Sequence, residues 1–395
     1  MEDDGMNKDR KITIVSIIMW AVCIILLFGY YTFFDVDKER ANNSEQEDSE
    51  VIEQEMNKNN QYEDRAKEIM SGMTLPQKIG QLFFARCPEN NAKSTIREYN
   101  LGAYILFARD FEGQTKESMA DKIKGYQENS KIPMLIGVDE EGGTVTRISR
   151  FDNFRAEKFW SPMQLYNEGG LDAIEKDTKE KCELLKSIGV NVNFAPVCDI
   201  ATEEDAFMYE RTIGQNSDVT ASYIKQMVYQ MDSLQVGSVL KHFPGYGNNV
   251  DTHVGEATDN RSLDDLRETD FVPFREGIKA GAGCILIAHN IIKSVDSENP
   301  ASLSEKMHEI LREELGYNNV IITDDLDMEG IDEELSEAEI AVKAITAGND
   351  MVITSKYKEQ ITAIKNAVNN GEISEDRINE SVVRVLCWKM SLGLM

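Results

Sequence analysis

Eight short apolar runs, separated by helix-length polar segments, predict a (β/α)8 barrel over residues 62–395 of this 395-residue chain. The runs do not alternate between apolar and polar residues, which is typical of parallel strands buried on both faces. Eight such runs with helices between them favour a closed barrel over an open sheet. The predicted strands are Gln81–Ala85, Ala103–Phe107, Met134–Val138, Val190–Ala195, Gly237–Leu240, Cys284–Ala288, Val320–Thr323 and Met351–Ile353.

Amphipathic segments between these runs predict the helices of the barrel. The clearest are Leu171–Ile188, Ser217–Leu234 and Leu263–Ala280, where apolar residues recur at helical spacing. Each segment lies between two predicted strands.

The N-terminus predicts a membrane anchor. Residues 12–34 (ITIVSIIMWAVCIILLFGYYTFF) contain no charge, and a helix of this length crosses a hydrocarbon core of about 30 Å. Basic side chains directly before the segment favour a cytoplasmic location for residues 1–11, with everything after Asp35 outside. A cleaved signal peptide is the alternative, but FGYYTFFDVD offers no A-x-A-like cleavage site, so an uncleaved signal anchor is favoured.

Residues 35–61 are charged, rich in amides and nearly free of bulky apolar side chains. Such a segment buries too little surface to offset its ordering entropy, so we expect a disordered acidic stalk before the barrel.

Composition excludes several classes of function. The net charge is -28, from 42 basic and 70 acidic side chains, which argues against nucleic-acid binding because no basic surplus neutralises phosphates. The six cysteines show no metal-binding spacing, and we expect buried free thiols. The sequence predicts neither a metal nor a cofactor.

Charged or imidazole side chains follow five of the predicted strands. In (β/α)8 barrels the carboxyl ends of the strands meet on one face, where catalytic residues collect. A single polar residue there is equally well an ordinary loop start, but five such endings favour an active site. These residues are Asp139, Asp199, Lys241 with His242, His289, and Asp324 with Asp325.

The motifs around these positions occur in an order that resembles glycoside hydrolase family 3. They are KIGQLF, ILFAR, DEEGGTVTR, NVNFAPVCD, KHFPGYG, VDTH, ITDDLDM and AGNDMVI. The resemblance covers roughly Leu75 to Leu394 and is greatest to the single-domain bacterial β-N-acetylhexosaminidases. Larger members carry the catalytic acid on a second domain; because this chain ends soon after the barrel, we expect the branch that uses a loop histidine.

The resemblance implies a retaining mechanism, in which a carboxylate attacks the anomeric carbon and an acid protonates the leaving oxygen. Asp324 matches the family nucleophile, with Asp325 as its competitor; neighbouring side chains on an extended segment point oppositely. His253 matches the acid of the family's D-x-H motif, and Asp251 would orient its ring and stabilise the imidazolium.

The resemblance also implies which residues bind the sugar. Each of these side chains is alternatively a structural ion-pair partner. The implied substrate-binding residues are Asp139, Arg147, Arg211, Lys241 and His242.

The sequence departs from the family pattern near the site. Tyr246 and Asn248 replace a usual loop histidine and acid, and Glu140 and Thr144 also differ from common residues. We expect these changes to affect loop closure or the aglycone accepted. His289 matches a family histidine that we expect to be architectural.

We therefore expect a membrane-anchored, extracellular exo-glycosidase that removes terminal β-linked N-acetylglucosamine, for example from peptidoglycan fragments. A glycoside phosphorylase on the same barrel and a non-catalytic surface glycan-binding protein are the alternatives. The sequence leaves the oligomeric state open.

Overall fold

The fold is that of a computed structural model, which describes residues 61–247, 257–328, 331 and 335–395. The predicted anchor (12–34) and nearly all of the predicted stalk lie outside these residues. Within them, no helix combines the length and apolarity needed to span a bilayer. Tyr62–Met395 forms one compact unit.

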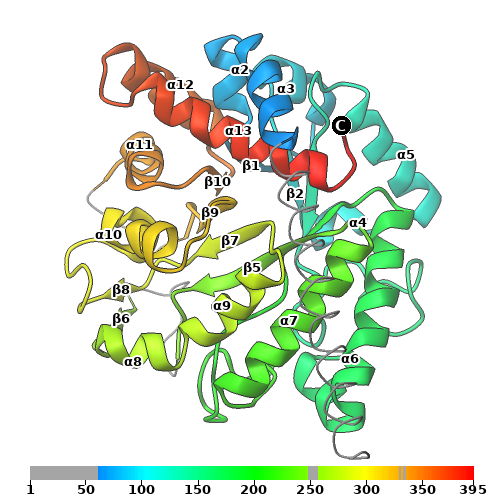
Figure 1. The fold of residues 1–395 in the computed structure, drawn as a ribbon. Coiled ribbons are helices and arrows are strands. Elements are labelled where there is room, and N and C mark those ends of the chain that lie inside the picture. The colour runs from blue at the N-terminus through cyan, green and yellow to red at the C-terminus, as the bar shows by residue number, and fades with distance from the viewer. Residues whose placement is uncertain (1–60, 248–256, 329–330, 332–334) are drawn as a thin grey trace, which may run out of the picture. The chain divides into compact units, whose positions relative to one another are not determined.

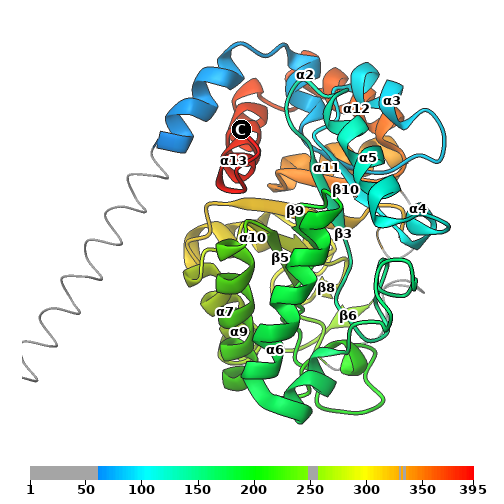
Figure 2. The same ribbon diagram turned by 90° about the vertical axis from the view of Figure 1, so that its right-hand side faces the viewer.

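Eight parallel strands close into a barrel, as the sequence predicts (Figures 1 and 2). Around the barrel their order is β1-β10-β9-β7-β5-β4-β3-β2, so each strand pairs with two parallel neighbours. Each predicted apolar run overlaps one of these strands, and β1, β5, β9 and β10 extend one to three residues beyond the predicted ends. The strands are β1 (Phe83–Arg86), β2 (Ala103–Leu106), β3 (Leu135–Val138), β4 (Val192–Asn193), β5 (Gly237–Phe243), β7 (Cys284–Ile287), β9 (Val320–Asp325) and β10 (Met351–Thr354). Beyond the barrel, β6 (Thr258–Asp259) and β8 (Ile291–Ile292) pair with each other.

Helices surround the barrel, and side-chain caps set several of their N-termini. For example, the side chains of Ser161, Ser262 and Ser336 accept hydrogen bonds from backbone N–H groups three residues later. The helices are α2 (Leu75–Gly80), α3 (Ala92–Tyr99), α4 (Ala108–Phe111), α5 (Lys116–Gln127), α6 (Pro162–Ser187), α7 (Ser217–Ser233), α8 (Leu263–Glu268), α9 (Phe271–Lys279), α10 (Glu305–Glu309), α11 (Glu337–Ala347), α12 (Tyr357–Asn369) and α13 (Glu375–Ser391).

Two predicted helices differ from the observed ones. The segment Leu263–Ala280 is not one helix but two, α8 and α9, because Pro273 cannot lie inside a continuous helix and is accepted in the first turn of α9. Helix α6 begins at Pro162, earlier than predicted, and contains a kink at Gly169 and Gly170.

The barrel interior is apolar and is closed at the amino ends of the strands by α13. Trp388 and Leu392 of this helix belong to the same buried cluster as Phe84, Leu135 and Ile322 on the strands. Trp388 lies so close to the starts of β5 and β7 that a Cβ at Gly237 or Gly283 would approach its ring to 3.0 or 2.2 Å. The polar residues at the opposite, carboxyl ends of the strands therefore form the open side of the barrel.

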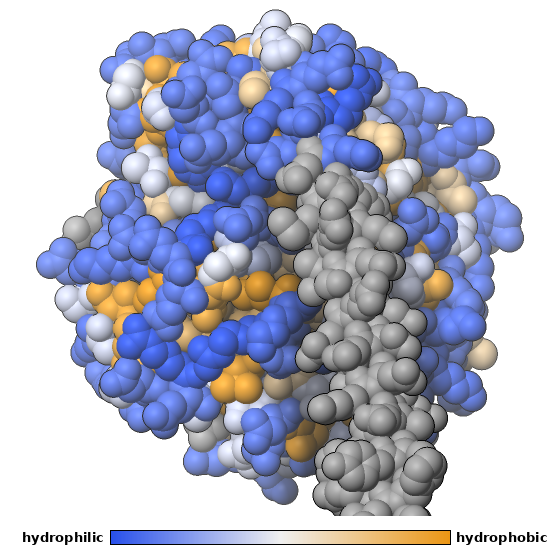
Figure 3. All heavy atoms as spheres, in the orientation of Figure 1, coloured by the Kyte–Doolittle hydropathy of each residue, from blue (hydrophilic) through white to orange (hydrophobic). Residues whose placement is uncertain are grey.

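The face drawn in Figure 3 is mostly hydrophilic where residues are described, with apolar side chains visible in gaps between helices. Four of the six cysteines, Cys87, Cys182, Cys198 and Cys284, are buried free thiols, as expected; Cys387 is a half-buried free thiol.

Candidate active site at the carboxyl ends of the strands

The loop after β3 is held in place by a buried glutamate. The carboxylate of Glu140 accepts hydrogen bonds from the backbone N–H groups of Arg147 (2.8 Å), Ile148 (2.7 Å) and Ser149 (3.2 Å). The side chain of Asn193 on β4 bonds both the N–H and the C=O of Glu140. Glu140 is one of the departures from the family pattern, and it fixes the path of the loop that carries Asp139 and Arg147.

Four predicted binding residues meet in one ion-pair network. Lys241 Nζ at the end of β5 lies 2.7 Å from Asp139 Oδ1 and 2.6 Å from Glu141 Oε1. Arg211 binds the same glutamate through two parallel bonds, Nη2 to Oε1 at 2.7 Å and Nε to Oε2 at 3.0 Å. Fork-to-fork pairing of this kind fixes direction as well as distance.

Neighbouring positive charges keep the buried carboxylate of Glu141 ionised. Burial alone would raise the pKa of Glu141, but the adjacent charges of Arg211 and Lys241 outweigh it and hold this pKa well below its usual range. The same pairing raises the pKa of Arg211 against the opposing effect of its own burial. Glu141 and Arg211 therefore stay charged at neutral pH.

His242, the fourth predicted residue of the network, is held in one tautomer. Its Nδ1 lies 2.8 Å from Asp199 Oδ2, and its Nε2 lies 3.2 Å from Nη2 of Arg211. The carboxylate only accepts and the guanidinium only donates, so Nδ1 carries the hydrogen and Nε2 accepts. Asp199 also accepts the backbone N–H groups of His242 and Tyr246, which fixes the turn after β5.

The end of β9 presents the two adjacent carboxylates. Asp325 is buried and pairs with Arg86 at the end of β1, and it accepts the N–H of Asp327 at 3.1 Å. Burial raises the pKa of Asp325 to about 6, against the lowering effect of Arg86. Asp324 is half-buried, and its Oδ1 accepts the N–H of Asp325 at 2.8 Å.

The pairing of β9 with β10 is irregular at this point, because Ile322 aligns with Met351 whereas Asp325 aligns with Ile353. Simple alternation along β9 is therefore an insufficient basis for separating the two carboxylates. What distinguishes them is that Asp325 is committed to Arg86 and Asp324 is more accessible.

Arg147 has an unsatisfied donor. Its guanidinium lies 5.9 Å from the centre of the Phe107 ring, which Arg86 also contacts at 5.2 Å. Its Nε is buried and has no hydrogen-bond partner among the described residues. An unpaired buried N–H costs about 1–3 kcal/mol, which a ligand oxygen at this position would recover.

Strand order relates these groups in space. In the closed barrel β9 and β3 are four positions apart, so Asp324 lies across the rim from Asp139. Lys241 and His242 lie among the last residues of β5, which is halfway between β9 and β3. Asp251 and His253, the predicted acid and its partner, lie outside the described residues.

Three site residues were not assigned a role from sequence: Glu141, Asp199 and Arg86. Asp199 was among the polar residues that follow predicted strands, whereas Glu141 was not singled out, although it lies two positions after Asp139 in the DEEGG motif. Arg86, at the end of the first strand, carries the same signal.

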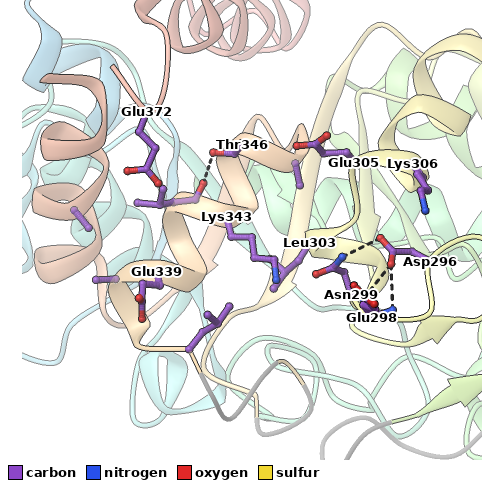
Figure 4. A pocket seen from close by; sticks show the side chains of 15 residues that line it. Asp296, Glu298, Asn299, Leu303, Glu305, Lys306, Glu339, Lys343, Thr346 and Glu372 are labelled. Atoms are coloured by element: carbon purple, nitrogen blue, oxygen red, sulfur yellow. Dashed lines mark hydrogen bonds between the residues drawn. The ribbon is translucent and has the colours of Figure 1, made fainter. Parts of the chain in front are cut away.

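A groove of about 700 Å³ is lined by side chains of α11 and of residues 296–306 (Figure 4). Leu303, Val342 and Ala347 contribute apolar side chains to it, and Asp296 beside it is bonded to Asn299 and Ser304. None of the predicted site residues lines this groove.

The sequence of the chain is similar to that of a known protein family. Residues 74–387 match the profile described as the glycosyl hydrolase family 3 N terminal domain. The chain is 28% identical over 350 residues to beta-hexosaminidase A of Pseudoalteromonas piscicida, which covers 81% of this chain and 56% of the relative. It is 34% identical over 227 residues to a beta-hexosaminidase of Xanthomonas campestris pv. campestris strain B100, which covers 57% and 68%.

Among solved structures, a family 3 beta-N-acetylglucosaminidase from Paenibacillus sp. str. FPU-7 is similar, with a TM-score of 0.76 and 30% identity. The match covers 82% of this chain and 63% of that protein. The chain thus spans a little over half the length of the P. piscicida relative and under two thirds of the Paenibacillus protein.

Proposed function

Because the chain belongs to glycosyl hydrolase family 3, we propose that it is a retaining exo-glycosidase that removes terminal β-linked N-acetylglucosamine. The relatives named beta-hexosaminidase and the similar beta-N-acetylglucosaminidase structure support the choice of sugar. If the predicted anchor places the barrel outside the cell, peptidoglycan fragments, chitooligosaccharides and host glycans are the substrates within reach.

The observation that carries the proposal is the arrangement of the rim. A half-buried carboxylate, Asp324, lies near the end of β9, on the same rim as a fixed network of charged donors and acceptors at the ends of β3 and β5. Directional polar groups on one wall hold the hydroxyls of a sugar, while the carboxylate on the other wall reaches its anomeric carbon.

The reaction then follows in two displacements. An oxygen of Asp324 forms a bond to the anomeric carbon as the glycosidic C–O bond breaks, and the leaving oxygen takes a proton from an acid. Water next attacks the same carbon, gives up a proton to the conjugate base and releases Asp324. We assign the acid to His253 and its orienting partner to Asp251, both on a segment outside the described residues.

The remaining predicted residues bind the sugar. Arg147 offers its unpaired Nε to a sugar oxygen. Lys241 has three N–H donors, of which two are directed to Asp139 and Glu141, and we assign the third to a hydroxyl. Both ring nitrogens of His242 are already bonded, so contact between this ring and the sugar requires its bond to Arg211 to be shared or replaced.

The test is hydrolysis of p-nitrophenyl β-N-acetylglucosaminide, with the β-glucoside for comparison. Asp324→Ala is expected to abolish turnover, and a 5-fluoro glycosyl donor is expected to label a peptide that contains Asp324. Labelling elsewhere, or none, contradicts the nucleophile assignment, and the second result favours a non-catalytic binding protein. Formation of sugar 1-phosphate on addition of phosphate identifies a phosphorylase instead.

The acid assignment has its own test. His253→Ala is expected to slow substrates with poor leaving groups far more than activated aryl glycosides, because activated leaving groups need little protonation. Equal losses on both classes count against His253.

A further inference from the structure

Two fully buried polar residues, His289 and Asn290, follow β7 and are not explained by the proposed chemistry. In the barrel β7 lies between β9 and β5, as Figure 1 shows. It therefore separates the strand that carries Asp324 from the strand that carries Lys241 and His242. The two side chains reach toward these neighbours in opposite directions.

The imidazole of His289 is bonded to the end of β9. Its Nε2 lies 3.1 Å from the backbone oxygen of Asp325, and its Nδ1 lies 2.7 Å from Ser302 Oγ. A carbonyl oxygen only accepts, so Nε2 donates to it; in the neutral ring Nδ1 is then the acceptor and the Ser302 hydroxyl donates. Ser302 is itself held, since its N–H donates to Ala288 O at 3.0 Å and its C=O accepts from Asn349 at 2.7 Å.

The carboxamide of Asn290 is bonded to the turn that follows β5. Its Nδ2 donates to the backbone oxygen of Gly245 at 3.2 Å, and the N–H of Gly245 donates to His242 O at 2.8 Å. The turn has little room to shift, because Gly245 has a φ of 117° and an added Cβ would lie 2.3 Å from Asp270 Oδ1. Asn290 thus holds the backbone of the turn that follows Lys241 and His242, two of the residues assigned to sugar binding.

We propose that His289 and Asn290 are positioning residues that fix the separation between the nucleophile end of β9 and the sugar-binding end of β5. The proposal rests on the proposed role of Asp324. Hydrogen bonds from His289 and Asn290 link the end of β9 and the turn after β5 to the same strand, β7. The Asp324 carboxylate and the bound sugar are therefore held at a fixed distance. In-line attack is sensitive to misplacement on the scale of 1 Å, which can cost about 100-fold in rate.

The proposal predicts that kcat and KM respond differently to the two residues. His289→Leu removes the donor to Asp325 and is expected to lower kcat for p-nitrophenyl β-N-acetylglucosaminide by about 10–100-fold, with KM within about twofold. His289→Gln keeps a donor at a similar reach and is expected to recover most of the rate. Asn290→Ala loosens the β5 side and is expected to raise KM more than it lowers kcat.

His308 supplies a matched control, since it is also a buried histidine, on α10, with Nδ1 bonded to the backbone oxygen of Ser304 at 2.8 Å. His308→Leu is expected to lower the unfolding midpoint while leaving kcat of the folded enzyme unchanged. If His289→Leu does not fold, Ser302→Ala tests the same link, because it leaves the ring without its Nδ1 partner, and it is expected to lower kcat severalfold.

The deciding readout is the rate at which the 5-fluoro donor labels Asp324 in the full-length chain. Slower labelling in His289→Leu with restoration in His289→Gln supports the proposal. An unchanged labelling rate, or a glutamine variant no faster than the leucine variant, overturns it. Failure of the parent enzyme to be labelled at Asp324 instead refutes the proposed function, so the two failures are distinguishable.

Discussion

At the scale of single residues, the charged side chains of the rim hold one another by ion pairs and hydrogen bonds. Most of these contacts involve Glu141 directly or through one neighbour. Its carboxylate is the shared partner of Lys241 and Arg211, and Arg211 in turn donates to His242. Removing one member of a buried ion pair is costly because the other charge stays buried without compensation. The positions of Lys241, Arg211 and His242 therefore depend on the single carboxylate of Glu141.

We expect Glu141→Gln to lower the free energy of unfolding by about 3–5 kcal/mol and to raise KM, because two buried cations lose a shared counter-charge. Denaturant unfolding and steady-state kinetics measure the two effects. The neighbouring Glu140→Gln is a matched control: Glu140 is equally buried but bonds backbone N–H groups and a serine, so a smaller loss of about 1–3 kcal/mol is expected. Equal losses in both variants would contradict this account.

Asp325 gives the stability of the protein a pH dependence of its own. Its pKa is raised to about 6 by burial, so between roughly pH 4 and pH 6 the folded state holds a proton that the unfolded state has lost. The parent should therefore lose stability relative to Asp325→Asn as the pH rises through this window, by up to about 3 kcal/mol. Urea unfolding of both proteins at pH 4 and pH 6 measures the difference, and a constant difference would exclude the raised pKa.

At the scale of elements, α13 closes the amino end of the barrel and also carries a buried amino group. Lys389 on this helix is fully buried and donates to Gln81 Oε1 at 2.6 Å. Burial lowers its pKa to about 7. Between pH 7 and the pKa of an unfolded lysine, the unfolded chain therefore binds one more proton than the folded chain.

We expect stability to rise with pH above 7 in the parent and not in Lys389→Met, with a difference of about 3 kcal/mol between pH 7 and pH 9.5. Methionine has a similar shape without a charge, so the variant should be more stable than the parent at pH 7. Chemical unfolding at the two pH values measures the effect. Parallel profiles for the two proteins would show that Lys389 stays protonated in the folded state.

The strands of the barrel were predictable because burial on both faces leaves a local signature, as in LIGV and VIIT. Only Pro273 indicates that Leu263–Ala280 divides into α8 and α9. The helical spacing of apolar residues continues past this proline and by itself predicts one helix. The partners of the rim residues were not predictable from local sequence. Asp199 and His242 are 43 positions apart, and only closure of the barrel brings them together.

At the scale of the whole chain, the predicted anchor decides where the barrel acts. If residues 12–34 stay in the membrane, the full-length chain should sediment with membranes, and a chain lacking residues 1–34 should not. Protease added to intact cells should then digest the barrel of the full-length protein. A new N-terminus close to Asp35 in the mature protein would show that the segment is a cleaved signal peptide instead.

Trp388 fills the amino end of the barrel against Gly237 and Gly283, and the apolar side chains of the strands fill the interior above it. A barrel packed in this way has no passage along its axis, so a ligand can approach only from the side where the strands end. The rest of a longer glycan must therefore extend away from that side into solvent. Free N-acetylglucosamine should consequently act as a competitive inhibitor, because substrate and product approach the same face.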